Sequence, residues 1–318
     1  MSRIASLACA IWALSLVPVP LASSWAFDLQ AHRGGRGLAP ENTLAAFRGA
    51  LELGVSTFET DLAVTKDNVL VLSHEPRLNP DLARGPDGKW VAAPGATIHS
   101  LTLGELWRYD IGRLNPDSNY AKQFPAQKPA DGERFPTLAE FYAMAGRTVR
   151  FNIETKIDPT KPGETVQPAV FAKLVVDAVR AAKMERRTTI QSFDWRTLIE
   201  AKRIAPEIET VCLTIESQNM NTVGPKPSPW LAGLDVSPGG SLQQQARAAG
   251  CSAWSPFWRN VTAANVTQAH KLDLNVIPWT VNDPAEMARL IDLKVDGLIT
   301  DYPDRALPVL AAKGLKIR

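Results

Sequence analysis

Charged and imidazole side chains recur in this sequence where short apolar runs end. His32 and Arg33 follow the first such run, and Glu59 and Asp61 stand two residues apart in a β-rich stretch. Carboxylates at positions i and i+2 of a strand project from the same face. Their mutual repulsion then requires a cation or a shared proton. The first two units of the chain therefore indicate a site with both cationic and anionic groups.

Later runs end in the same way, and their terminal polar residues are His74, Glu154, Lys156, Gln191, Trp279 and Asp301. The carboxylates of Glu59, Asp61 and Glu154 are suited to holding one hard divalent cation through oxygen. Two histidines serve acid–base chemistry, and Arg33 with Lys156 can hold an anion between them. Trp279 offers an apolar wall. Together these groups suit the hydrolysis of a phosphate ester.

A scaffold that gathers strand ends must position these residues. Apolar runs of strand length alternate with helical patterns about eight times along the chain of 318 residues. This alternation indicates parallel strands, and a (β/α)8 TIM barrel brings every strand C-terminus to one mouth. A doubly wound open sheet is the alternative, which the absence of GxGxxG and GxxxxGK[ST] motifs disfavours. We expect the barrel, with an inserted segment at about 77–135 after the second strand region that shapes substrate access.

The N-terminal residues read as an export signal. Arg3, an apolar stretch at 4–16 and a small-x-small site at 24–26 predict a signal peptide over 1–26 and a single domain over 27–318. The apolar stretch is shorter than the roughly 20 residues of a membrane span. We therefore expect a periplasmic or secreted protein. The two cysteines left after cleavage, Cys212 and Cys251, form either a disulfide or two buried thiols.

The charge pattern excludes one class of partner. The net charge of +2 and the lack of a basic cluster with interleaved aromatics argue against nucleic-acid binding. We expect a small-molecule partner, and the sequence gives no indication of the oligomeric state.

Segments along nearly the whole mature chain resemble, in order, the signature segments of the glycerophosphodiester phosphodiesterases. They are HRG…PENT (32–43), FETDLAVTKDNVLVLSH (58–74), FNIETK (151–156), IQSF (190–193), PWTVND (278–283) and DGLITDYP (296–303). The resemblance implies a (β/α)8 barrel with an insertion after the second strand region. It also implies an acid–base pair of His32 and His74, and phosphate contacts from Arg33 and Lys156. Ca²⁺ or Mg²⁺ would bind to the three carboxylates named above.

The sequence departs from the family pattern at a few positions. Glu75 follows His74 where the family usually has aspartate, which bears on how the imidazole is oriented. Glycines common in the family are replaced within 271–274 and at 293–294. Since those positions lie at helix ends away from the expected mouth, we expect an effect on packing only.

The expected activity is metal-dependent cleavage of a glycerophosphodiester to sn-glycerol 3-phosphate and an alcohol, with water or the substrate's own 2-hydroxyl as nucleophile. One alternative is a lysophospholipase D or sphingomyelinase D-like activity, for which Trp254, Phe257 and Trp258 would form either an acyl-chain surface or part of the core. The other is a non-catalytic glycerophosphodiester-binding protein.

Overall fold

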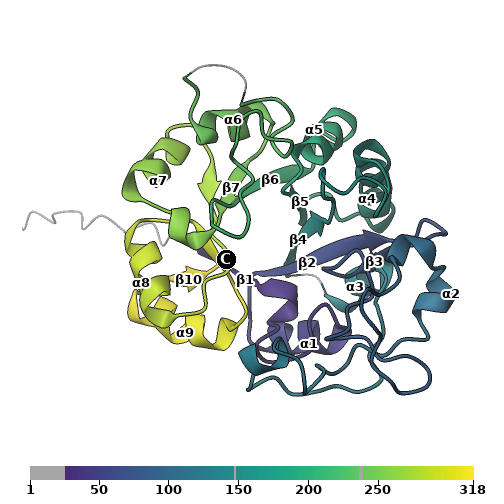
Figure 1. Cartoon of the computed structure of the whole chain (residues 1–318). Coiled ribbons are helices and arrows are strands. Elements are labelled where there is room, and N and C mark those ends of the chain that lie inside the picture. Colours follow the sequence, from purple (N-terminus) through teal and green to yellow (C-terminus); the bar gives the residue numbers. More distant parts are fainter. Residues whose placement is uncertain (1–25, 147, 236–238) are drawn as a thin grey trace, which may run out of the picture.

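The computed structural model describes residues 26–146, 148–235 and 239–318, where helices surround a parallel barrel (Figure 1). The barrel strands are β1 (Ala26–Ala31), β2 (Thr57–Val64), β4 (Arg150–Thr155), β5 (Thr188–Ser192), β6 (Glu209–Thr214), β7 (Ala253–Pro256), β8 (Asn275–Val276) and β9 (Gly297–Thr300). The helices around them are α1 (Leu44–Glu52), α3 (Leu138–Met144), α4 (Pro168–Ala182), α5 (Trp195–Ile204), α6 (Leu242–Ala248), α7 (Ala263–His270), α8 (Pro284–Asp292) and α9 (Pro303–Ala312). The expected signal peptide lies outside the described residues except for Ala26, which begins β1.

The strands pair in parallel around a nearly closed ring. β1 lies between β2 and β9, and pairing continues through β4, β5, β6 and β7 to β8. Backbone hydrogen bonds then join the β8 segment to β9, from Asp296 N to Val276 O (2.8 Å) and from Val281 N to Ile299 O (2.9 Å). A short strand, β10 (Lys316–Ile317), pairs with the start of β1. The expected TIM barrel is confirmed, and the open doubly wound sheet is wrong.

The strand expected over 275–281 is shorter than its apolar pattern indicates, since β8 ends at Val276. Pro278 lies within the run and has no amide hydrogen to donate, which interrupts the strand ladder. The backbone of Trp279 still donates to Pro256 O at 3.1 Å. The chain therefore stays beside β7 and carries Trp279 to the barrel mouth.

The second strand region is a hairpin. β3 (Leu70–Leu72) runs antiparallel to β2, with Leu62 opposite Leu72, so it is not a strand of the barrel wall. Because the hairpin folds back over the barrel end, His74, which follows β3, returns to the mouth. A strand-end pattern thus placed His74 correctly although the strand itself runs in the opposite direction.

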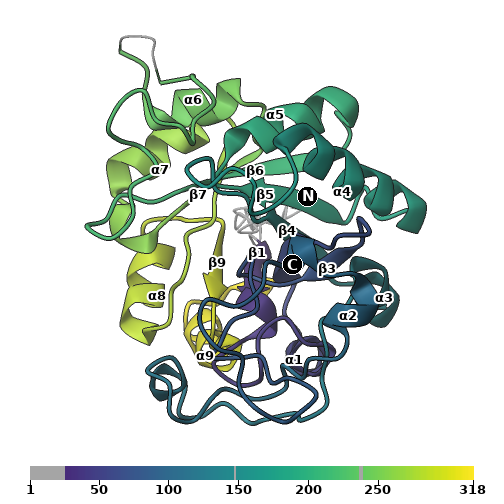
Figure 2. The same ribbon diagram turned by 45° about the vertical axis from the view of Figure 1, so that its right-hand side comes forward.

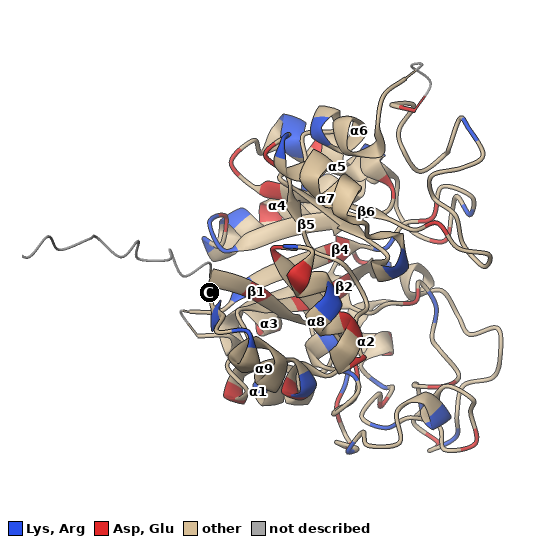
Figure 3. Ribbon diagram, turned by 90° about the vertical axis from the view of Figure 1, so that its left-hand side faces the viewer, with Lys and Arg blue, Asp and Glu red and all other residues tan. Residues whose placement is uncertain are grey.

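The segment from 73 to 137 lies beside this hairpin. Its short helices are η2 (Ile98–Ser100), α2 (Leu103–Leu106) and η3 (Ala121–Gln123), and two further 3-10 turns in the chain are η1 (His32–Gly34) and η4 (Trp258–Asn260). A separate apolar cluster that includes Leu78, Ile98 and Leu106 packs against Val71 of β3. In Figure 2 this segment lies along the lower edge of the molecule. Figure 3 shows this segment and residues 215–235 extending from one end of the barrel, with the C-terminus at the opposite end.

Local sequence signals explain the helix boundaries. Threonine, serine or aspartate accepts a hydrogen bond from the first turn of α1, α3, α5, α6, α7 and α8. In α4 the apolar residues at three- and four-residue spacing are buried, among them Phe171, Val175 and Val179. In the described part of the chain, no helix combines the length and the apolar character that a membrane span requires.

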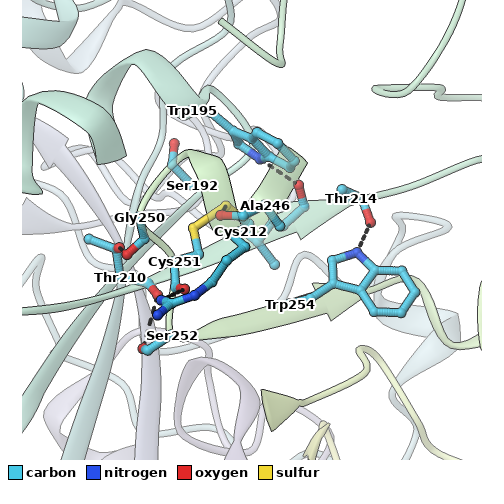
Figure 4. Close-up of a disulfide and its surroundings, with 12 residues drawn as sticks. Ser192, Trp195, Thr210, Cys212, Thr214, Ala246, Gly250, Cys251, Ser252 and Trp254 are labelled. Atoms are coloured by element: carbon cyan, nitrogen blue, oxygen red, sulfur yellow. Dashed lines mark hydrogen bonds between the residues drawn. A yellow bond between two sulfur atoms is a disulfide. The ribbon is translucent and has the colours of Figure 1, made fainter. Parts of the chain in front are cut away.

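Cys212 of β6 and Cys251, which precedes β7, form a disulfide (Figure 4). Both residues are fully buried, and the bond joins neighbouring barrel strands behind α6. Of the two alternatives left open by the sequence, the structure therefore has the disulfide.

The replaced glycines affect the backbone and not only the packing. Asp273 after α7 and Lys294 after α8 have φ values of 55° and 68°. This left-handed conformation is unfavourable for a residue with a Cβ atom.

Candidate active site

The turn after β1 brings its backbone into the mouth. Arg33, Gly34 and Gly35 all have positive φ, and a Cβ atom at Gly34 would lie 2.8 Å from Ala46 Cβ. The turn is therefore tight against α1 and needs glycine at this position. Its geometry directs the amide of Arg33 to Glu59 Oε2 at 3.0 Å.

Strand register brings three carboxylates together. Glu59 and Asp61 project from one face of β2, and Asp61 lies directly opposite Glu154 of β4. One oxygen from each of the three lies within 4.8 Å of the others, and each residue is at most 6% exposed. Asp61 Oδ1 is buried without a hydrogen-bond partner. An all-oxygen set with an unsatisfied buried oxygen fits a hard divalent cation.

The electrostatics of these carboxylates agree with that fit. Burial, followed by the nearby charges of Asp61 and Glu154, holds the pKa of Glu59 well above its usual range. Burial likewise raises the pKa of Glu154 to about 7, although Lys156 opposes the shift. Burial also opposes ionisation of Asp61, but Arg33, His74 and Lys156 outweigh it and lower its pKa. Without a cation the cluster therefore retains protons on its glutamates.

Two cationic side chains lie beside the cluster, each held by an acid. Arg33 Nη1 donates to Glu41 Oε1 at 2.8 Å, and Arg33 Nε lies 3.1 Å from Asp61 Oδ2. Lys156 Nζ lies 2.8 Å from Glu154 Oε1. Arg33 and Lys156 line the same cavity, so they can hold the oxygens of one anion.

Each mouth histidine has one ring nitrogen engaged by a carboxylate. His32 Nδ1 lies 2.6 Å from Asp301 Oδ1, and His74 Nδ1 lies 2.7 Å from Glu75 Oε1. With Nδ1–H donating to the carboxylate, Nε2 remains available for proton transfer. Glu75 thus reaches the imidazole despite its extra methylene group.

Both imidazoles favour their neutral form. Burial lowers the pKa of His32 to about 4, and the charges of Arg36 and Arg33 assist while Asp301 opposes. Loss of hydration, then the charges of Arg33 and Lys156, lower the pKa of His74. Near pH 7 each ring can therefore accept a proton.

Comparison with known proteins agrees with this arrangement. The model of the glycerophosphoryl diester phosphodiesterase family matches residues 32–305. The chain belongs to this family. A glycerophosphodiester phosphodiesterase of Caldanaerobacter subterraneus subsp. tengcongensis is 29% identical over 289 residues, which cover 89% of this chain and 98% of that protein. One of Bacillus subtilis is also 29% identical, with 86% and 83% covered.

Solved structures extend the comparison. A family protein from Silicibacter pomeroyi superposes with a TM-score of 0.82 at 32% identity, covering 92% of this chain and 96% of its own. A phosphodiesterase of Oleispira antarctica, solved with the product sn-glycerol 3-phosphate, has a TM-score of 0.67 at 20% identity, with 91% and 98% covered, and so shows the shared fold. The chain is accordingly an enzyme, a glycerophosphodiester phosphodiesterase.

Two further predicted residues lie in this phosphodiesterase cavity with different partners. Gln191 Nε2 donates to Glu59 Oε1 at 2.7 Å, and Gln191 Oε1 accepts from Asn152 Nδ2 at 2.8 Å. Its amide therefore orients a cluster carboxylate. The indole N–H of Trp279 donates to Ser255 O at 3.0 Å, so Trp279 presents its ring to the cavity.

The structure adds residues to which the sequence assigned no role. Arg36 Nε donates to Asp301 Oδ1 at 2.7 Å, and Arg36 Nη1 donates to the hydroxyl of Tyr120 at 2.9 Å. That hydroxyl in turn donates to Glu41, which holds Arg33. Arg36 lies in the loop after β1 with His32 and Arg33, so its position in the sequence could have indicated a role in the site. Tyr120 comes from the irregular 73–137 segment, where no sequence pattern pointed to the site.

All the predicted site residues thus meet at the strand ends. Glu59, Glu154, both histidines and both cations line a cavity of about 100 Å³, with Gln191 and Trp279 on its wall, and Asp61 lies beside the two glutamates. The cavity adjoins a larger chamber of about 480 Å³ that shares Arg33, His74 and Trp279 with it.

Proposed function

We propose that this site hydrolyses glycerophosphodiesters to sn-glycerol 3-phosphate and an alcohol, with His32 and His74 moving the protons. The observation that carries the proposal is the pairing of two carboxylate-held imidazoles with a buried acidic cluster at one cavity. Glu59, Asp61 and Glu154 would hold the divalent cation, Ca²⁺ or Mg²⁺. When bound, the cation would offset negative charge on the phosphoryl oxygens.

The chain's own groups have distinct tasks in this proposal. Arg33 and Lys156 bind the non-bridging phosphoryl oxygens, since both cations line the cavity. His32, the more deeply buried imidazole, takes the proton of the attacking hydroxyl at Nε2. The new P–O bond forms as the bond to the leaving alcohol breaks.

His74 has the complementary task. It lines both the small cavity and the larger chamber. In this proposal it acts in its protonated form, which the bound anionic phosphodiester favours, so its Nε2 proton can pass to the departing alkoxide. Glu75 at Nδ1 stabilises the imidazolium from which that proton comes. Water and the substrate's 2-hydroxyl both suit this geometry. Incorporation of oxygen-18 and a search for a cyclic phosphate distinguish them.

The test is release of sn-glycerol 3-phosphate from a glycerophosphodiester, with Ca²⁺, with Mg²⁺ and with chelator. His32→Ala and His74→Ala should each lower kcat by roughly 10²-fold or more, the usual contribution of a general acid or base. His270→Ala is the matched control, because His270 of α7 pairs at 2.9 Å with Asp296, which precedes β9 at the end of the barrel away from the mouth. Near wild-type turnover in either mouth variant would refute the assignment, and full turnover in chelator would refute the metal.

A lysophospholipase D-like activity is a second candidate, which the apolar residues in one part of the chamber lining favour. Two of the aromatic residues predicted for an acyl-chain surface, Trp254 and Phe257, have different surroundings. Trp254 is 1% exposed and its N–H donates to Thr214 Oγ1, so it belongs to the core. Phe257 contacts Trp279 instead. Comparing a glycerophosphodiester with its sn-1-acyl form as substrates separates the two activities.

We also propose that the protein is exported to the periplasm or the medium. The N-terminal pattern supports this, and so does the disulfide, because such bonds persist in oxidising compartments. Cell fractionation with N-terminal sequencing of the mature chain is the test. A full-length cytosolic product would contradict the proposal.

A further inference from the structure

The chamber beside the catalytic cavity is continuous with the phosphate-binding groups. Arg33, His74, Glu154 and Lys156 line both spaces. A phosphodiester has two ester groups that diverge from phosphorus, and the residues that would hold the phosphate border both the smaller cavity and the chamber. One ester group of a bound substrate must therefore extend into the chamber of about 480 Å³.

Aromatic rings from three different loops that follow barrel strands form one wall of this chamber. Phe193 follows β5, Trp230 lies after β6 and Trp279 lies after β8. The ring of Phe193 stands almost perpendicular to both indoles, with centroid distances of 5.3 Å to Trp279 and 6.3 Å to Trp230. Phe193 thus meets both indole rings nearly at right angles in this wall. The indole N–H of Trp279 already donates a hydrogen bond to Ser255 O.

The remaining lining distinguishes between classes of alcohol. Ile157, Ile215 and Met220 extend the apolar surface. The hydroxyl groups of a polyol that face this wall would be left without hydrogen-bond partners, which is unfavourable. A quaternary ammonium group has no hydrogen-bond donor to lose, and it is attracted to aromatic faces.

Charge around the chamber favours a cation. Beyond the phosphate end, the carboxylates of Glu75, Asp158 and Glu164 line it, against the single ammonium of Lys161. Lys161 Nζ lies 3.6 Å from Asp158, and Glu164 also accepts from Arg77 at 3.0 Å. The acidic groups therefore outnumber the basic ones among the lining residues at the end where the alcohol would lie.

We propose that this chamber is the leaving-alcohol subsite and that it selects an alcohol bearing a quaternary ammonium group over a polyol. The inference rests on the proposed phosphodiesterase function. It also explains why His74, and not His32, faces the chamber, since the group that enters it needs a proton as it departs.

The experiment compares kcat/KM for glycerophosphodiesters of three alcohols: choline, its uncharged isostere 3,3-dimethylbutanol, and glycerol. The choline ester should be preferred over the glycerol ester by at least about tenfold, which corresponds to about 1.4 kcal/mol, with the isostere between them. Trp230→Ala should lower kcat/KM for the choline ester about tenfold and reduce this preference. Trp230→Phe should restore part of it.

Trp90→Ala is the matched control, because Trp90 packs against Arg84 in the 73–137 segment. Thermal unfolding of the Trp230 variants shows whether they are folded. Equal kcat/KM for all three esters, or an equal loss on all three in Trp230→Ala, would overturn this inference alone. Equal rates for the choline ester and its isostere would mean that the chamber selects apolar surface and not charge. Absence of sn-glycerol 3-phosphate from every ester would instead overturn the proposed function.

Discussion

Replacing Asp301 with asparagine tests whether the orientation of His32, and not only its presence, supports turnover. Asp301 Oδ1 lies 2.6 Å from His32 Nδ1 and also accepts from Arg36, while Oδ2 accepts from Asn282 at 2.7 Å. The carboxylate is 1% exposed. The substitution keeps the shape of the side chain, but it removes the charge that stabilises a protonated imidazole, and its single oxygen cannot accept from both His32 and Asn282.

The expected loss follows from that charge. A hydrogen bond to a charged group contributes about 1.5–3 kcal/mol, which corresponds to roughly 10- to 150-fold in kcat. KM should change little, because Arg33 and Lys156 hold the phosphoryl group and neither contacts Asp301. Asp301 also raises the pKa of His32 against the effect of burial. Without the carboxylate this pKa falls below its present value of about 4, so raising the pH cannot rescue the activity.

Steady-state kinetics between pH 6 and pH 9 measure the effect, with thermal unfolding as a check on folding. Asp296→Asn is the matched control, because Asp296 holds His270 at 2.9 Å outside the site, and it should keep wild-type kcat. The reasoning is refuted if Asp301→Asn stays within threefold of wild type. It is also refuted if the loss is in KM alone or if the control loses as much.

The metal cluster, the 73–137 segment and the backbone each give a further prediction. Because burial raises the pKa of Glu154 to about 7, calorimetric Ca²⁺ or Mg²⁺ affinity should weaken from pH 8 to pH 6, and Glu154→Gln should bind weakly with a smaller pH change; equal slopes would contradict this. Tyr120→Phe removes the donor to Glu41 and should lower kcat/KM by roughly tenfold, a hydrogen bond to a charged group, whereas unchanged kinetics would leave Tyr120 without a positioning role. In urea unfolding, Lys294→Gly should add about 1 kcal/mol by relieving a φ of 68°, while Lys271→Gly, where φ is −63°, should cost about as much; the same sign in both would contradict the argument.

The barrel and most of its mouth follow from local patterns. Alternation of apolar runs and helical stripes specifies the βα units, and parallel strands force polar residues at their C-terminal ends to one side. The register of β2 against β4 places Asp61 beside Glu154, and it follows from the pattern of buried side chains on the two strands. The residue types at the strand ends were therefore enough to predict the candidate site without any knowledge of tertiary contacts.

The features that could not be predicted from the sequence depend on contacts between distant segments. Tyr120 lies in a segment without periodicity, so nothing local distinguishes it from other exposed aromatic residues. The disulfide required Cys212 and Cys251 to lie on neighbouring strand ends, a fact of tertiary structure. Pro278 did signal a break in its strand, but the apolar pattern around it was stronger. Sequence patterns detect the periodic spacing of residues, and none of these three features depends on periodic spacing.

The acids of the site form two groups that sequence alone did not separate. Glu41, Glu75 and Asp301 each hold one catalytic or phosphate-binding group, respectively Arg33, His74 and His32. Glu59, Asp61 and Glu154 form the metal cluster, in which Asp61 also lies 3.1 Å from Arg33 and Glu154 lies 2.8 Å from Lys156. These two cations do not fully balance the cluster, since the pKa values of Glu59 and Glu154 are raised and Asp61 Oδ1 is buried without a hydrogen-bond partner. A divalent cation resolves that imbalance, and a phosphodiester then brings its negative charge to a cation, an arginine and a lysine already in position. The two groups of acids thus separate orientation from metal binding, which is why the loss of Asp301 should change kcat without changing metal affinity.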